Sequence, residues 1–382
     1  PSTVLFHKTV ISFDKIQRRS QKMLHFIKLK EKGDENEMKK WTARILAMLM
    51  ILALVGCGGD SGSTDESGGS DGETLQLTLS LAQDTENPVY LGAVYFADRL
   101  KELSGGTMET TVHPNSALGG EEEIVEMQSY GDSITFSLPS GYTLQKYTPA
   151  MYAADFYFQF ENYDQVWAFY DGAYGDYVKE SLDGTGLVVT SFWDNGFRNL
   201  TTTNREVHTA GDLKGVKLRV MSAETHMAAW QAIGAAATPI AYSEIYSSLQ
   251  QGVVEGQENP VFNIIGSRFQ EVQKYLILTR HVHDPSPFII SGTAWDSWSE
   301  EQRQWVTQAS EEAAEYMRAE AAEMENAKIQ ELQDAGMTVI ELTEEERQTF
   351  VDAVDGVAEQ FRDEMGEEAW ELYQTCITEA QG

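Results

Sequence analysis

The pattern of apolar and polar positions divides residues 74–382 into alternating strands and helices. Residues 75–81 alternate with a period of two, which predicts a strand. Residues 89–104 carry apolar groups at helical spacing and end at Gly105-Gly106, a typical helix stop. The same pattern predicts a helix at 121–130 and strands at 110–114, 133–138, 187–192 and 216–220. This alternation favours an α/β fold with largely parallel sheets.

Two further helices are predicted from their first residues. Ser299 is followed three positions later by Gln302, the pattern of a capping box, and this helix could continue through Glu331 to a stop at Gly336. Thr343 begins a second helix in the same way.

The N-terminal 73 residues have a different character. Residues 38–57 consist of a short positive stretch, an apolar run and the segment Leu-Val-Gly-Cys, which resembles the lipobox of a bacterial lipoprotein signal peptide, with lipidation at Cys57. An ordinary signal peptide with a chance cysteine is the alternative. Residues 58–73 contain Gly, Ser and acidic residues and predict a flexible linker. We expect residues 1–37 to be a non-native upstream extension.

Length and charge narrow the possible functions. The chain has 382 residues, with 28 Lys and Arg against 60 Asp and Glu, for a formal charge of −32. This length predicts two domains at roughly 150 residues each. So acidic a chain is not expected to bind nucleic acid, because recognition of phosphates needs clustered positive charge. Cys57 and Cys376, the only cysteines, lie too far apart in sequence to indicate a disulfide framework or a metal site.

Motifs of catalysis are scarce. The sequence contains no phosphate-binding Gly-Lys-Ser/Thr loop, no Gly-x-Ser-x-Gly elbow and no His-Glu-x-x-His helix. His281 and His283 could in principle bind zinc, but the alternative of a structural, partly exposed strand end is favoured. Acidic residues 121–123 and 344–346 fit the start of a helix better than general acids. We therefore expect neither metal nor cofactor.

Two arginines occupy positions where side chains are usually buried. Arg219 lies within the predicted strand 216–220, and Arg198 lies a few residues after the strand 187–192. A buried guanidinium loses its hydration and needs a carboxylate or several carbonyls in return. The residues alone leave two alternatives open: an internal ion pair, or a bound anion.

Several ordered blocks resemble the solute-binding proteins of tripartite ATP-independent periplasmic (TRAP) transporters, of the C4-dicarboxylate and sialic-acid receptor type. The resemblance covers about residues 75–375. The blocks are residues 211–220, 234–239, 242–250 and 254–260, with 114–120 and 196–202 upstream. The resemblance implies an α/β, two-lobed periplasmic-binding-protein-like fold with two mixed, mostly parallel sheets and a long bracing helix. We expect lobe I from 74–196 plus 285–324 and lobe II from 197–284 plus 325–378.

The resemblance also implies ligand-binding residues. By position, Arg219 matches the arginine that forms a two-pronged salt bridge with the ligand carboxylate, a geometry that suits a planar guanidinium. Arg198 matches a second arginine near that carboxylate, and Asn259 an asparagine that also binds it. Tyr242 falls at an aromatic position that lines the ligand. Trp193 is a weaker candidate for a wall of the site, and core packing is the alternative for both aromatic residues.

Departures from the family pattern bear on the ligand. Pro139 and Ala82 stand where sialic-acid receptors have a glutamate and an asparagine, which disfavours sialic acid. The polar groups still available on that lobe could bind the hydroxyls of a sugar acid; they are Gln83, Asp84, Glu121 and Ser140. Because Glu121 would repel a second ligand carboxylate, a hydroxylated monocarboxylate such as a hexuronate is favoured over a C4-dicarboxylate.

The sequence thus predicts an extracytoplasmic TRAP receptor and not an enzyme. We expect it to capture a small organic anion with a carboxylate, to deliver it to the membrane permease subunits, and to be a monomer that meets the membrane only through a lipid at Cys57. Two alternatives stay open at this point. One is a secreted carbohydrate-active enzyme with paired carboxylates, and the other is a ligand-binding sensor module.

Overall fold

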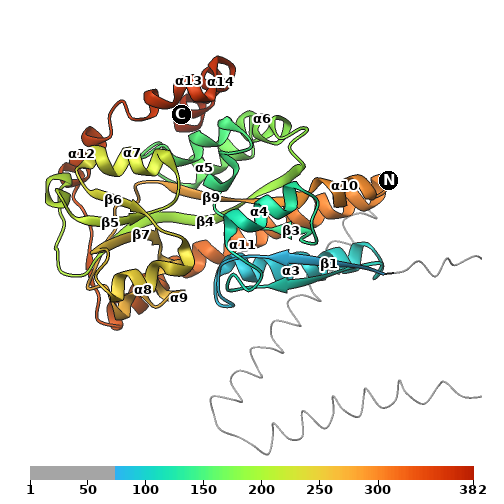
Figure 1. Cartoon of the computed structure of the whole chain (residues 1–382), viewed down its shortest axis with the longest axis horizontal. Helices are drawn as coiled ribbons and strands as arrows, with labels where there is room; N and C mark the ends of the chain where they lie inside the picture. The colour runs from blue at the N-terminus through green and yellow to red at the C-terminus, as the bar shows by residue number, and fades with distance from the viewer. Residues whose placement is uncertain (1–73) are drawn as a thin grey trace, which may run out of the picture. The chain divides into compact units, whose positions relative to one another are not determined.

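One long strand, β4 (Leu187–Thr202), connects the strands of residues 74–382 into one sheet, in which two short strands branch off the main order at β4. The computed structural model describes residues 74–382. The predictions for residues 1–73, including the lipidation of Cys57, lie outside the described residues. Figure 1 shows β4 and β9 (His283–Ser291) running side by side between two groups of strands.

The first group of strands surrounds β1 (Leu75–Ser80), which pairs in parallel with β2 (Met108–His113) and β3 (Phe136–Ser137). Strand β9 joins this group antiparallel to β3 and pairs with the first part of β4. The predicted strands at 75–81 and 110–114 are thereby confirmed. The strand predicted at 133–138 is shorter than expected, because only two of its residues are in the sheet.

The second group of strands begins on the other half of β4, which pairs antiparallel with β7 (Gly256–Pro260) and β8 (Tyr275–Ile277). The strand predicted at 216–220 is β5 (Lys217–Val220), and it lies parallel between β7 and β6 (Ala236–Pro239). Strand β10 (Thr338–Ile340) pairs in parallel with β8. The two predicted sheets exist, but β4 makes them continuous.

Helices flank both groups of strands. The α-helices are α3 (Pro88–Leu103), α4 (Glu121–Ser129), α5 (Tyr163–Tyr170), α6 (Ala173–Ser181), α7 (Glu224–Ile233), α8 (Ile245–Gln250), α9 (Val261–Gly266), α10 (Gly292–Ser297), α11 (Glu300–Asp334), α12 (Glu344–Ala353), α13 (Arg362–Met365) and α14 (Glu367–Gln381). Short 3₁₀ helices are η1 (Gly141–Leu144), η2 (Pro149–Asp155), η3 (Ala210–Leu213), η4 (Tyr242–Glu244), η5 (Phe269–Glu271) and η6 (Ala358–Phe361). None of the helices in residues 74–382 combines the length and apolar character needed to cross a bilayer.

The long helix α11 begins as the sequence predicts. Ser299 Oγ accepts a hydrogen bond from the backbone N–H of Gln302 at 3.2 Å, and Gln302 Oε1 accepts one from the N–H of Ser299 at 2.8 Å. The helix spans 35 residues, roughly 50 Å at 1.5 Å per residue. It contacts α3, β4 and α9, and therefore touches elements beside both strand groups. The prediction of a long bracing helix is confirmed.

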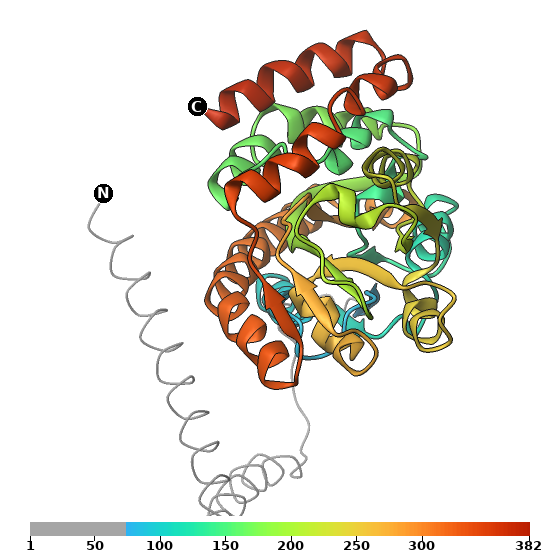
Figure 2. The same ribbon diagram turned by 90° about the vertical axis from the view of Figure 1, so that its left-hand side faces the viewer.

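The last helix, α14, packs on α5 and α6. Figure 2 shows the C-terminal helices, in red, over the green helices of this region. Aromatic rings join them: Phe156 lies 6.2 Å from Trp370 and 5.3 Å from Tyr373, between ring centroids. Residues 358–381 thus contact a part of the chain that the predicted boundaries place in lobe I. Those boundaries stay a prediction.

A bulge interrupts the pairing of β4 with β9. Asp194 pairs with Pro285 and Gly196 with Asp284, so Asn195 is an extra residue on β4. Gly196 has φ +111°, a conformation that other residues rarely adopt. A β-bulge bends a strand and can redirect a side chain beside a functional site. The strand predicted at 187–192 therefore continues through this bulge to Thr202, which its sequence pattern did not indicate.

Candidate functional site

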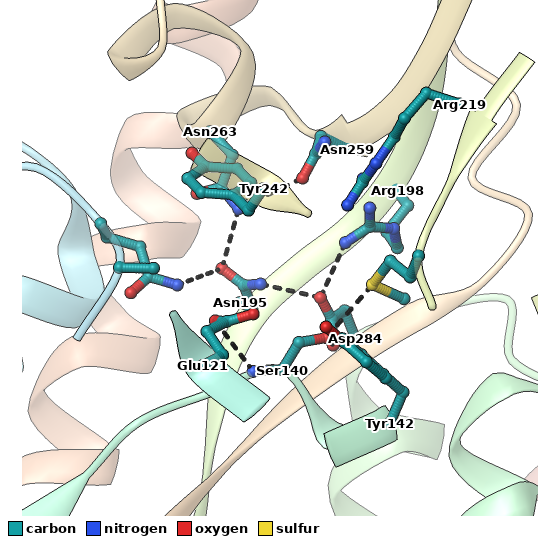
Figure 3. A pocket seen from close by; sticks show the side chains of 13 residues that line it. Glu121, Ser140, Tyr142, Asn195, Arg198, Arg219, Tyr242, Asn259, Asn263 and Asp284 are labelled. Atoms are coloured by element: carbon teal, nitrogen blue, oxygen red, sulfur yellow. Dashed lines mark hydrogen bonds and ion pairs between the residues drawn. The ribbon is translucent and has the colours of Figure 1, made fainter. Parts of the chain in front are cut away.

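A pocket lies between the two strand groups, where β4 and β9 pass from one to the other. Several of its residues lie at or just beyond the carboxyl ends of the parallel strands β1, β3, β5 and β7, the usual position of ligands in α/β sheets. Figure 3 shows the 13 lining residues: Ala82, Gln83, Glu121, Ser140, Tyr142, Asn195, Arg198, Arg219, Met221, Tyr242, Asn259, Asn263 and Asp284.

Arg219 reaches the pocket from β5 and forms no ion pair with a carboxylate of residues 74–382. Its Nε donates to the carbonyl oxygen of Ile240 at 2.8 Å. The side chain makes no other hydrogen bond within residues 74–382, and Nη1 is buried there without a partner. None of the carboxylate oxygens in this part of the chain comes within 4.0 Å of it. Burial lowers the pKa of Arg219 to about 10, which leaves the guanidinium charged at neutral pH.

Arg198, on β4, is neutralised by the protein. Its Nε donates to Glu258 Oε2 at 2.5 Å, Nη2 donates to Glu258 Oε1 at 3.0 Å, and Nη1 donates to Asp284 Oδ2 at 2.8 Å. Although burial lowers the pKa of Arg198, the two carboxylates outweigh this effect and raise it above its usual value. The structure therefore decides between the two alternatives for each buried arginine. Arg198 forms an internal ion pair, and Arg219 does not.

Amide side chains form one wall of the pocket. Asn195 Oδ1 accepts hydrogen bonds from Gln83 Nε2 at 3.4 Å and from Asn263 Nδ2 at 3.3 Å. Asn263 Oδ1 in turn accepts from Asn87 Nδ2 at 2.9 Å. Asn259 Nδ2 donates to Gln257 Oε1, and Gln83 Oε1 is buried without a partner in the described chain. These amides come from both strand groups, so the network spans the pocket.

An acidic side chain occupies the part of the pocket near α4. Glu121 Oε1 accepts the backbone N–H of Ser140 at 3.2 Å. Asp284 accepts from Ser140 Oγ at 2.6 Å and from Asn195 Nδ2 at 2.8 Å, in addition to Arg198. Burial, with the negative charge of Asp284, raises the pKa of Glu121 to about 7. In Figure 3 Glu121 and Ser140 lie on the opposite side of the pocket from Arg219.

Tyr242 contributes an aromatic surface from η4. Its hydroxyl lies 2.7 Å from Ser267 Oγ, which fixes the ring beside the pocket. Burial raises the pKa of Tyr242 to about 12, so the phenol is neutral at physiological pH. The aromatic position that the resemblance implied therefore lines the pocket.

Trp193 does not lie in the pocket. Its side chain is fully buried, its ring stacks on Phe288 with centroids 5.5 Å apart, and its Nε1 donates to Ser191 Oγ at 3.0 Å. Residues alternate between the two faces of a strand, and Trp193 takes the face that packs in the core with α3 and α11. The prediction that Trp193 forms a wall of the site is wrong, and its core-packing alternative holds.

The two histidines on the approach to β9 are buried, not partly exposed as predicted. His281 Nε2 lies 3.1 Å from Glu258, and His283 Nε2 lies 2.9 Å from Asp194. Burial lowers the pKa of His281 to about 4, so its neutral ring donates to the carboxylate. In the part of the chain that the structure describes, no cluster of three or more His, Cys, Asp or Glu could hold a metal.

The structure brings seven of the predicted residues together: Gln83, Glu121, Ser140, Arg198, Arg219, Tyr242 and Asn259. Asp84 lines a different pocket. Sequence reasoning missed Asn195, Asn263 and Asp284. A glycine inside an apolar strand often indicates a bulge, and Gly196 could have drawn attention to Asn195. No comparable local signal exists for Asp284, because its role depends on the distant partners Ser140 and Arg198.

Comparison with known proteins adds independent information. Residues 80–364 match the family described as bacterial extracellular solute-binding protein, family 7. A solute-binding protein of Verminephrobacter eiseniae is 34% identical over 78% of this chain and 88% of its own. The 2,3-diketo-L-gulonate-binding periplasmic protein of Escherichia coli is 31% identical over 69% of this chain and 80% of its own.

Solved structures of TRAP solute-binding proteins share the fold. The sugar acid binding protein of Advenella mimigardefordensis, in complex with galactonate, superposes with a TM-score of 0.78 and 28% identity, covering 81% of this chain and 100% of its own. A protein of Sulfurospirillum deleyianum with bound succinate gives 0.74 at 30% identity, covering 78% and 98%. A protein of a Sulfitobacter species with bound β-D-galacturonate gives 0.76 at 25% identity, covering 80% and 100%.

These relatives decide the class of the protein. They are substrate-binding proteins of transporters, so the alternative of a carbohydrate-active enzyme is wrong. The protein is an extracytoplasmic receptor that captures a small organic acid and works with a TRAP membrane permease. The two-lobed α/β fold agrees with this assignment. The chain belongs to the family 7 bacterial extracellular solute-binding proteins, the receptors of TRAP transporters.

Proposed function

We propose that this receptor binds a small sugar acid, a hexuronate or a related hydroxylated acid, with its carboxylate on Arg219. The single observation that carries the proposal is the free guanidinium of Arg219, whose Nη1 is buried without a partner among the described residues. A buried charge without a counter-charge is costly. A carboxylate would supply the missing charge and accept two parallel N–H bonds from the guanidinium.

The rest of the pocket favours a ligand with several hydroxyls. Gln83, Asn195, Asn259 and Asn263 offer amide groups that can donate or accept, and Glu121 offers acceptor oxygens. Tyr242 presents a flat ring of the kind that packs on the carbon face of a sugar. Arg198 is already held by Glu258 and Asp284, so we assign it a positioning role beside the carboxylate site. Relatives that bind galactonate and galacturonate support this ligand class.

Thermal-shift measurements with a panel of acids would test the proposal. Galactonate, galacturonate and erythronate should each be compared with acetate, which has the carboxylate but no hydroxyls. A ligand at 100 times its dissociation constant should add about 2.7 kcal/mol to the free energy of unfolding. If none of the hydroxylated acids raises the melting temperature more than acetate does, the proposal is wrong.

We also propose that the receptor works as a monomer that closes on its ligand. The pocket is lined from both strand groups, with Gln83 and Glu121 on one side and Arg219 and Tyr242 on the other. A ligand that contacts both sides favours the closed arrangement, because only those contacts distinguish it from an open one.

A lipid anchor at Cys57 is the final part of the proposal. It is supported by the sequence of residues 38–57 and by the extracytoplasmic location of the family. The linker of residues 58–73 would have a root-mean-square span of roughly 20 Å. The receptor could therefore stay close to the membrane and its permease while the folded part moves freely.

A further inference from the structure

Apart from Glu121, the charged side chains at the pocket sum to zero, although Arg219 is not part of an ion pair with the described residues. Arg198 and Arg219 supply two positive charges, while Glu258 and Asp284 supply two negative charges. Both carboxylates accept hydrogen bonds from Arg198, and Asp284 also accepts from Ser140 and Asn195, as ionised acids do. Glu121 is therefore a negative charge in excess of this balance.

Glu121 lies where the far end of a ligand would be. It belongs to the first turn of α4 and lines the same pocket as Arg219, but from the other strand group. Its Oε1 accepts only the N–H of Ser140, and its Oε2 makes no hydrogen bond within residues 74–382. An acid that binds Arg219 by one carboxylate and extends across the pocket would bring its other end towards this free oxygen.

The groups that face Glu121 leave it poorly compensated. Burial disfavours its charge and Asp284 on β9 repels it, while the positive charges of Arg198 and Arg219 compensate only in part; together these raise the pKa of Glu121 to about 7. Two phenols also face it and remain neutral, since burial raises the pKa of both. These neighbours are Asp284, Arg198 on β4, Arg219 on β5, Tyr142 on η1 and Tyr242 on η4, with Glu122 and Glu123 on α4 itself.

We propose that Glu121 sets the charge preference of the pocket, favouring acids with a single carboxylate over those with a second carboxylate at the far end. The inference rests on the proposed function, since it assumes that Arg219 holds one carboxylate. A hydroxyl beside Glu121 donates a hydrogen bond to it. A carboxylate at that place cannot donate to the charged Glu121 and binds only when Glu121 has taken up a proton, which weakens its binding about tenfold for each pH unit above the pKa of Glu121.

The ligands bound by the relatives include both of the classes that this inference separates. Their bound ligands include galactonate and galacturonate, with one carboxylate, and succinate, with two. The fold alone therefore does not decide between the two ligand classes. The acid at position 121 would decide it through charge, without any change in the shape of the fold.

The test compares galactonate with galactarate, which differ by one terminal carboxylate, using calorimetric titration. At about pH 8, wild type should bind galactonate roughly tenfold more tightly, because the pKa of Glu121 is about 7 and each pH unit above it costs a factor of ten. Glu121→Gln keeps the shape but removes the charge, and should reduce this ratio to about twofold or less. Glu123→Gln is the matched control, because it removes the same charge from an exposed position in the same helical turn. The control should keep the wild-type ratio.

Each outcome of this comparison has a defined meaning. Equal binding of both acids to wild type, or an unchanged ratio in Glu121→Gln, would overturn the role of Glu121 and leave the proposed function intact. Failure of wild type to bind galactonate, galacturonate and erythronate would instead overturn the proposed function, and the inference with it. If Glu121→Gln does not fold, wild type alone tests the inference. The ratio of its affinities for the two acids should be smaller at about pH 5.5 than at about pH 8. At the lower pH Glu121 is protonated, whereas ligand carboxyls, with pKa values of about 4, stay ionised. A constant ratio would overturn the inference.

Discussion

Arg198 and Arg219 line the same pocket, but only Arg198 is paired with protein carboxylates. Two arginines of similar burial can therefore have different tasks. The ion pairs of Arg198 hold β4, β7 and β9 together, since Glu258 lies on β7 and Asp284 on β9. The guanidinium of Arg219 keeps its terminal nitrogens for a ligand. This difference leads to opposite expectations for the two substitutions.

Replacing Arg219 should affect binding far more than folding. Arg219→Ala removes the two-pronged contact with the ligand carboxylate, a loss of about 2–5 kcal/mol, or roughly 30-fold to several thousand-fold in affinity. Arg219→Lys should also bind poorly, because an ammonium keeps the charge but lacks the fork. Calorimetric titration with galacturonate measures both effects. Unchanged affinity in Arg219→Ala would show that the ligand role assigned to Arg219 is wrong.

Replacing Arg198 should chiefly affect folding. Arg198→Ala leaves Glu258 and Asp284 buried without their counter-charge, which should lower the free energy of unfolding by about 3–5 kcal/mol. Chemical denaturation of the ligand-free protein measures this change, and Arg219→Ala is the control because it breaks no ion pair. If both variants unfold at the same denaturant concentration as wild type, the ion pairs of Arg198 do not stabilise the fold.

The raised pKa of Glu121 predicts a pH dependence of stability. The folded protein binds the Glu121 proton more tightly than the unfolded chain does, since the pKa rises from 4.5 to about 7. The contribution of this group is therefore full below about pH 4.5 and is lost as pH rises through 7. The loss amounts to at most about 3 kcal/mol. Glu121→Gln should remove this pH dependence. The difference in the free energy of unfolding between variant and wild type should therefore grow from about pH 5 to about pH 8.

Denaturation of both proteins at the two pH values checks this prediction. Glu123→Gln again serves as the control, because its exposed side chain should not change the pH profile. A stability difference that is the same at both pH values would mean that Glu121 titrates as an ordinary glutamate.

The proposed lipid anchor can be tested by cell fractionation. Cys57→Ser removes the thiol that would carry the lipid, so the protein should appear in soluble extracytoplasmic fractions while its melting temperature stays that of wild type. Wild type expressed in the same bacterium, one that processes lipoproteins, should remain with the membrane. Membrane association of the serine variant would contradict the proposal.

Local patterns gave the capped helices correctly because their signals are local. Ser299 and Gln302 need only each other to begin α11. Strand β4 was predicted too short, because the bulge at Asn195 and the positive φ of Gly196 interrupt the alternation by which a strand is recognised. Trp193 was misplaced for a related reason: the sequence places it near the site, and only the packing of α3 and α11 shows which face of β4 it takes.

The site was predictable where the family resemblance marks residues and unpredictable where a distant partner decides their role. Arg219, Asn259 and Tyr242 lie in the pocket as the resemblance implied. The sequence could not show that Arg198 would be neutralised, since Glu258 and Asp284 lie 60 and 86 positions away. It could not show the charge balance around Glu121 for the same reason.

The passage of β4 through both strand groups has a consequence for binding. Asn195 and Arg198 belong to this strand and Asn259 to its neighbour β7, so their backbones are fixed by sheet hydrogen bonds before a ligand arrives. The conformational entropy of these pocket residues is thus lost during folding and not during capture. A ligand of few atoms makes few contacts with the pocket. Because the sheet is already ordered, most of the free energy of these contacts contributes to the affinity.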